Sequence, residues 1–251
     1  MKSNHTFRLL PLLLPAMGLA VLILRLSLQI FCLDEKGLLP VGHPLEWLIW
    51  LLTAAAVAIP FLAVRKLDGS RLYRRNFRAS VAAAIGAIAL AGGVFVSVVL
   101  NFSAESKLAL LRNIFGLLAV PALIYTGLQR WKGRKPFFLG YGLIFLFFTL
   151  HTISHYPQWS SQPQMLRYIF TTFACIFLML FSYYQTAFCV GLGNRRMQLG
   201  TGLLAAFFCA AAFMDSGDAM LYLTAGFWAI TNLCELTPAV KTREEETHDP
   251  S

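Results

Sequence analysis

Long apolar segments dominate this 251-residue sequence, in which 57% of the residues are hydrophobic and 13% are charged. A helix needs about 20 mostly apolar residues to cross the roughly 30 Å hydrocarbon layer of a bilayer. Runs of this kind, bounded by charged or turn residues, occur eight times. They cover approximately Leu9–Phe31, Trp47–Val64, Ala79–Leu100, Leu108–Leu128, Phe137–Tyr156, Tyr168–Val190, Leu199–Met214 and Ala219–Leu236.

These runs predict an all-α protein, a polytopic transmembrane helix bundle of about eight spans. Helices are predicted rather than barrel strands because the runs do not alternate between apolar and polar residues. The bundle is expected to fill residues 1–240 as one domain, and the charged residues 241–251 are expected to form a disordered tail. The last two spans are joined by a tight turn, so a broken helix or a re-entrant pair is the alternative there.

Charge placement predicts the orientation of the bundle. Most of the 21 Lys and Arg residues fall on the side of the N-terminus, which places both termini in the cytoplasm of a multi-pass cell-membrane protein. The net charge of +9 is therefore a topology signal, and nucleic-acid binding is not expected.

A basic cluster leads into the third span. Arg71, Arg74, Arg75 and Arg78 have the i, i+3, i+4, i+7 spacing of one helical face. We expect this face to anchor the chain at anionic lipid headgroups. Docking of an anionic cytosolic ligand is the alternative, since Arg suits phosphate and carboxylate.

Two histidines form an HxxxH pattern near the outer end of the fifth span. His151 and His155 lie four residues apart, which puts both rings on one helical face, close enough to share a divalent metal ion. Asp215 is the predicted third ligand, with Asp218 or Glu105 as alternative carboxylates. The other interpretation is that His155 belongs to the interfacial aromatic belt and His151 bonds a neighbouring helix.

Two arginines inside predicted spans are further candidates. Arg25 and Arg112 either extend to the outer headgroups or pair with acids or an anionic solute, and Asn113 adds hydrogen-bonding capacity beside Arg112. Ionisable groups at membrane depth are by default functional candidates.

Arg25, Arg112, Asn113, His151 and His155 therefore form the predicted ligand site. The sequence favours a small-solute transporter, or a membrane subunit of one, with an outward-facing polar site. A noncatalytic scaffold, sensor or accessory subunit is the first alternative. An intramembrane hydrolase that uses the histidines, an acid and a metal to act on lipid or envelope material is the second, although no nucleophile motif accompanies them. Enzymatic activity is thus the less expected outcome, and no cofactor other than a divalent metal is suggested.

Overall fold

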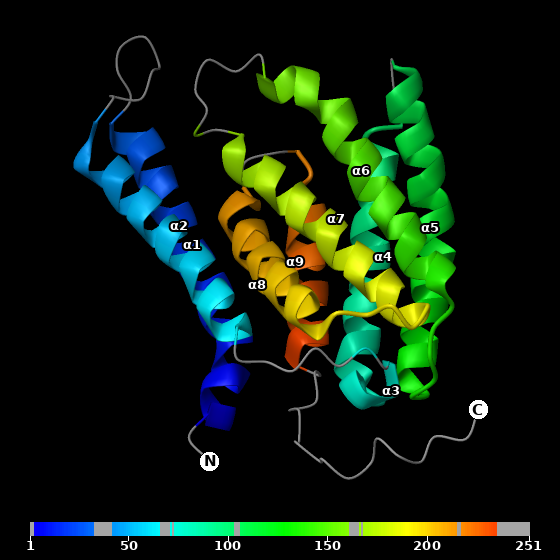
Figure 1. Cartoon of the computed structure of the whole chain (residues 1–251). Helices are drawn as coiled ribbons and strands as arrows, with labels where there is room; N and C mark the ends of the chain where they lie inside the picture. The colour runs from blue at the N-terminus through cyan, green and yellow to red at the C-terminus, as the bar shows by residue number, and fades with distance from the viewer. Residues whose placement is uncertain are drawn as a thin grey trace.

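The computed structural model describes residues 3–32, 42–65, 71, 73–102, 106–160, 166, 168–214 and 217–234, and the side chains of 3–8, 74, 75 and 158–160 are outside this description. Helices account for almost all of it (Figure 1). They are α1 (Ser3–Phe31), α2 (Pro44–Val64), α3 (Tyr73–Asn76), α4 (Val81–Leu100), α5 (Lys107–Trp131), α6 (Phe138–Ser160), α7 (Ile169–Cys189), α8 (Arg195–Ala212) and α9 (Ala219–Cys234). The predicted all-helical architecture is confirmed for the described residues.

Local capping explains where several of these helices begin. The Ser80 hydroxyl accepts a hydrogen bond from the amide of Ala83 at the start of α4, and Ser106 does the same for Ala109 in α5. Asn194 accepts from the amides of Arg196 and Met197 at the start of α8. Such side chains satisfy amides that have no partner within a helix.

Six helices are long and apolar enough to cross a membrane: α1, α2, α4, α5, α6 and α7. The other two long helices fall short. At 1.5 Å per residue, the 18 residues of α8 rise about 27 Å and the 16 of α9 about 24 Å, and α8 begins with two arginines. The chain is therefore a helical protein of membrane type, and the span count of eight stays a prediction.

The helices from α4 to α9 form a closed ring. Each packs against the next in sequence, and α9 packs against α4 to close the ring, with α1 lying against α8 and α2 against α1 and α8 (Figure 1). Trp228 of α9, Phe181 of α7 and Tyr141 of α6 fill its interior. All three are at most 1% exposed, and the Phe181 and Trp228 ring centroids are 4.9 Å apart.

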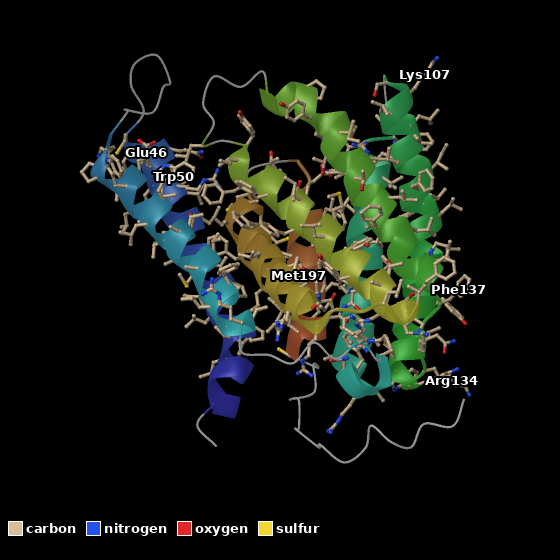
Figure 2. The ribbon with its side chains drawn as sticks, in the orientation of Figure 1. Glu46, Trp50, Lys107, Arg134, Phe137 and Met197 are labelled. Carbon is tan, nitrogen blue, oxygen red and sulfur yellow. The ribbon has the colours of Figure 1, made fainter. Side chains whose placement is uncertain are left out.

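Polar residues gather at the two ends of this ring. The histidine end is where α5 and α9 begin and α6 ends, and the arginine end is where α5 ends and α8 begins. Figure 2 shows Lys107 and Glu46 at the histidine end, and Arg134 and Phe137 at the arginine end. The assignment of the arginine end to the cytoplasm stays a prediction.

The predicted helical face from Arg71 to Arg78 is not formed. Among the described residues of this stretch only Tyr73–Asn76 is helical, and the chain is extended at Ser80, just before α4 begins. Tyr73 and Phe77 are buried here, whereas Arg71 and Arg78 are exposed; the side chains of Arg74 and Arg75 lie outside the described residues. Burial of the two aromatic rings and the Ser80 cap interrupt the helix, and contact of the arginines with lipid headgroups stays a prediction.

Close packing of α4 on α9 depends on glycine at one face of α4. A Cβ atom at Gly93 would collide with Thr224 and lie 3.1 Å from the Met220 carbonyl oxygen, whereas one at Gly92 would meet nothing within 4 Å. Gly93→Ala should therefore lower the free energy of unfolding by about 1–3 kcal/mol. Gly92→Ala, its matched control, should be neutral or stabilise by up to about 1 kcal/mol. Equal stabilities of the two variants in a detergent unfolding titration would contradict this packing.

Candidate metal centre

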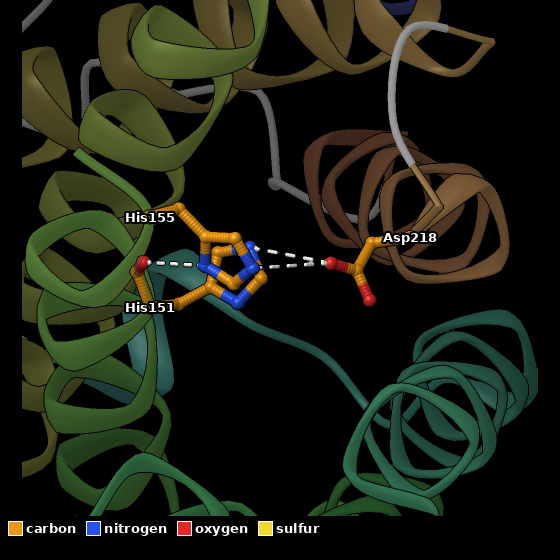
Figure 3. Close-up of side chains that lie close together, drawn as sticks. All are labelled: His151, His155 and Asp218. Carbon is orange, nitrogen blue, oxygen red and sulfur yellow. Dashed lines mark hydrogen bonds and ion pairs between the residues drawn. The ribbon is translucent and has the colours of Figure 1, made fainter. Parts of the chain in front are cut away.

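Two imidazoles and a carboxylate converge at the histidine end of the ring (Figure 3). The Nε2 atom of His151 lies 3.8 Å from Oδ2 of Asp218, and Nε2 of His155 lies 3.9 Å from the same oxygen. One ligand atom from each residue falls within 4.8 Å of the others. His151 is fully buried, Asp218 is 6% exposed and His155 is 16% exposed.

Helix geometry supplies two of these three groups. The four-residue step on α6 stacks the histidine rings with centroids 4.3 Å apart, as the sequence predicts. Asp218 precedes α9, and its backbone carbonyl accepts hydrogen bonds from the amides of Leu221 and Tyr222. Because the backbone carbonyl of Asp218, and not its side chain, accepts these helical hydrogen bonds, the carboxylate is available to the histidines.

The neighbouring helix α4 fixes the carboxylate of Asp218. Its Oδ1 atom accepts hydrogen bonds from the hydroxyl of Ser97 at 2.6 Å and from the side-chain amide of Asn101 at 3.2 Å. The other oxygen, Oδ2, faces the histidines. Groups that orient a ligand in this way commonly support metal sites.

Arg112 and Asn113 of α5 complete the polar cluster. The Nη1 atom of Arg112 lies 3.4 Å from both ring nitrogens of His155, and its Nε and Nη2 atoms donate to Oδ1 of Asn113. Asn113 in turn donates to the carbonyl of Asn101 at 2.8 Å. Arg112 is 3% exposed, so it does not extend to the headgroups. When both imidazoles are neutral, the positive charge of Arg112 balances the negative charge of Asp218.

A hydroxyl and a thiol lie on the inner side of the cluster. The Tyr222 hydroxyl is 3.4 Å from Nε2 of His151 and 3.2 Å from the sulfur of Cys175. If Nε2 of His151 bound a metal ion, Tyr222 would lose that hydrogen bond and keep Cys175 as a partner. The bond to His151 agrees with the alternative that this histidine contacts a neighbouring helix.

Arg25 lies apart from this cluster. Its Nη1 atom donates to the carbonyl of Ala211 at 2.9 Å and its Nη2 atom to that of Leu166 at 2.8 Å. The guanidinium also lies 4.4 Å from the ring centroid of Phe170, and the residue is 1% exposed. Of the alternatives for Arg25, extension to the headgroups does not fit this burial, because Ala211 at the end of α8 and Leu166 present backbone acceptors within the protein.

Four of the predicted site residues thus come together, namely Arg112, Asn113, His151 and His155. Asp215, the predicted third metal ligand, lies outside the described residues, and Asp218 is the carboxylate that meets the histidines. The sequence pattern predicts no role for Ser97 or Tyr222, because their contacts with Asp218 and His151 depend on how the helices pack. Their functional roles, and that of the whole cluster, stay predictions.

The class of protein is now defined in outline: an all-helical membrane-type bundle with a buried cluster of two histidines, an aspartate and an arginine. No known family model, curated protein or solved structure matches this chain.

Proposed function

We propose that this membrane protein binds a divalent transition-metal ion through His151, His155 and Asp218. The observation that carries the proposal is the convergence of their three ligand atoms within 4.8 Å from separate parts of the sequence. Zinc bonds of 2.0–2.2 Å place tetrahedral ligands roughly 3.4 Å apart. The separations of 3.8 and 3.9 Å from Oδ2 of Asp218 need only a small closure to reach this value.

The composition of the cluster supports an open site rather than a closed structural one. Three protein ligands leave a fourth tetrahedral position, as in catalytic zinc sites. The positive charge of Arg112 opposes binding of a cation and favours an anionic or water-derived group at that position. The negative charge of Asp218 offsets part of this repulsion. Hydrogen bonds from Ser97 and Asn101 hold its carboxylate in place.

A titration of purified protein with zinc tests the proposal. Zinc at about 100 times its dissociation constant should stabilise the protein by roughly 2.7 kcal/mol, seen as a raised melting temperature. His155→Ala should abolish the shift because it removes one of three ligands. His248→Ala, which removes a histidine from the C-terminal segment, is the control and should respond like the parent. Equal zinc responses in all three proteins would contradict binding at the cluster.

A metal-assisted hydrolase acting on lipid is supported by one further observation. A groove of about 270 Å³ between α4 and α5 is lined by apolar side chains and by Asn113. Asn113 accepts from Arg112, which contacts His155, so this lining residue is linked to a metal ligand through one arginine. An acyl chain in this groove would lie against Asn113, and a metal ion held by His151, His155 and Asp218 would supply an activated water as the nucleophile for such a reaction.

Small-solute transport, as predicted from the sequence, remains the other use of such a site. It requires a passage through the ring, whose interior holds Trp228, Phe181 and Tyr141, so these side chains would have to move. Zinc-65 uptake by vesicles containing the protein would favour transport. Zinc-dependent release of fatty acid from phospholipid would favour the hydrolase. Zinc binding without either activity would favour a sensor or scaffold.

A further inference from the structure

A buried arginine, Arg130, lies at the arginine end of the ring, away from the candidate metal centre. Arg130, near the end of α5, is 2% exposed, and its Nη1 atom donates to the hydroxyl of Tyr73 at 3.0 Å. Its Nε and Nη2 atoms have no hydrogen-bond partner in the described part of the chain. These two atoms form one edge of the guanidinium, the kind of edge that donates two parallel hydrogen bonds to a carboxylate or phosphate.

Aromatic rings hold this guanidinium without neutralising it. It lies 4.7 Å from the ring centroid of Phe77 and 5.9 Å from that of Tyr73. Burial raises the pKa of Tyr73, despite the opposing effect of Arg130, so the phenol remains neutral at physiological pH. The contact with Tyr73 therefore leaves the charge of Arg130 uncompensated.

The described carboxylates lie elsewhere. Glu46 and Asp218 are the only acidic residues among those the structure describes, and both are at the histidine end. A second cation, Arg195, is 6% exposed and contacts the same one-turn helix α3 by donating to Asn76 at 3.2 Å. Among the described residues no acid lies beside Arg130, and a buried charge without a partner is costly unless an anion is bound.

Two of the three other buried arginines each have described acceptors for two of their guanidinium nitrogens. Arg25 donates to two backbone carbonyls, and Arg112 donates through Nε and Nη2 to Asn113. In Arg130 only Nη1 has an acceptor in the described chain, and the whole Nε and Nη2 edge has none. Tyr73, the acceptor of Nη1, belongs to α3, a single turn, and such short helices have little stability of their own.

We propose that the Nε and Nη2 edge of Arg130 binds a phosphate group at the arginine end, beside α3. Either the head of an anionic phospholipid or a free phosphate ion has the required chemistry, because both offer paired oxygens to the guanidinium. This site is separate from the proposed metal centre, and its occupancy does not depend on that proposal.

The test is a thermal-shift titration of detergent-purified protein with two probes. One probe is phosphatidic acid against phosphatidylcholine, and the other is sodium phosphate against sodium chloride at equal ionic strength. The parent protein should be stabilised by at least one phosphate probe. Arg130→Lys keeps the charge but removes the two-donor edge, and should weaken the apparent dissociation constant at least tenfold.

Two controls make the outcome decisive. Arg134→Gln removes an exposed cation four residues away and should leave the response unchanged, which separates a specific site from general attraction to basic residues. Arg130→Gln, which also removes the charge, should abolish the response; if this variant has a lower starting stability, Arg130→Lys still reports on the site. A response to the lipid alone assigns the phosphate to a headgroup, and a response to sodium phosphate assigns it to the free ion. The proposal is overturned if neither probe stabilises the parent, or if Arg130→Lys and Arg134→Gln respond equally.

Discussion

Replacement of Arg25 by methionine should lower the free energy of unfolding by about 3 kcal/mol, a large effect for one residue. Methionine keeps much of the apolar stem but removes both donors to the carbonyls of Ala211 and Leu166. These bonds attach α1 to the end of α8 and to the segment before α7. The expected loss follows because hydrogen bonds from charged groups contribute more than neutral ones and the carbonyls lose their donor.

Arg65→Met provides a matched control for this prediction. Arg65 also lies over a phenylalanine, 4.7 Å from the ring centroid of Phe61, but its side chain is exposed. An exposed cation–π contact contributes roughly 0.5–1 kcal/mol at most. Unfolding titrations in mixed detergent micelles should therefore separate the two variants, and similar losses for both would contradict the structural role of Arg25.

Substitution of Asp218 should have a comparable effect in the absence of metal. Asp218→Ala removes the acceptor of Ser97 and Asn101 and the charge that offsets buried Arg112, so we expect a loss of about 3 kcal/mol or more. Asp218→Asn retains an oxygen acceptor and should cost less. Both variants should lose the zinc response, because the neutral amide is a much weaker ligand than the carboxylate.

A double-mutant cycle isolates the charge effect from packing. Arg112→Gln removes the positive charge, so its combination with Asp218→Asn should be less destabilised than the sum of the single variants. Strict additivity would show that the two charges do not stabilise one another. Retention of the zinc response in Asp218→Asn would contradict the assignment of this residue as a ligand.

The histidine pair illustrates what the sequence can predict. A four-residue spacing within an apolar helix determines that His151 and His155 share a face, because local helix geometry alone sets this relation. The third group depends on where α9 begins. Asp215 and Asp218 are three residues apart in the sequence, and the position of Asp218 against the histidines depends on the contacts of its carboxylate with Ser97 and Asn101.

The arginines show where sequence reasoning fails. A long side chain near a span end suggests contact with headgroups, yet Arg25 finds its acceptors inside the protein because α8 is short and ends beside it. The spacing from Arg71 to Arg78 fits a helix, but the burial of Tyr73 and Phe77 limits α3 to one turn. Both outcomes depend on contacts between distant segments, which periodicity within one segment does not reveal.

The metal centre can be tested most directly by X-ray absorption spectroscopy at the zinc edge on protein loaded with one equivalent of zinc. The proposed site predicts two imidazole nitrogens at about 2.0–2.1 Å and a carboxylate oxygen at about 2.0–2.2 Å. Because His155→Ala should no longer hold zinc at the cluster, the imidazole signal should be lost in that variant. A spectrum of zinc bound only by water or other oxygens, or one unchanged in His155→Ala, would contradict a metal site formed by His151, His155 and Asp218.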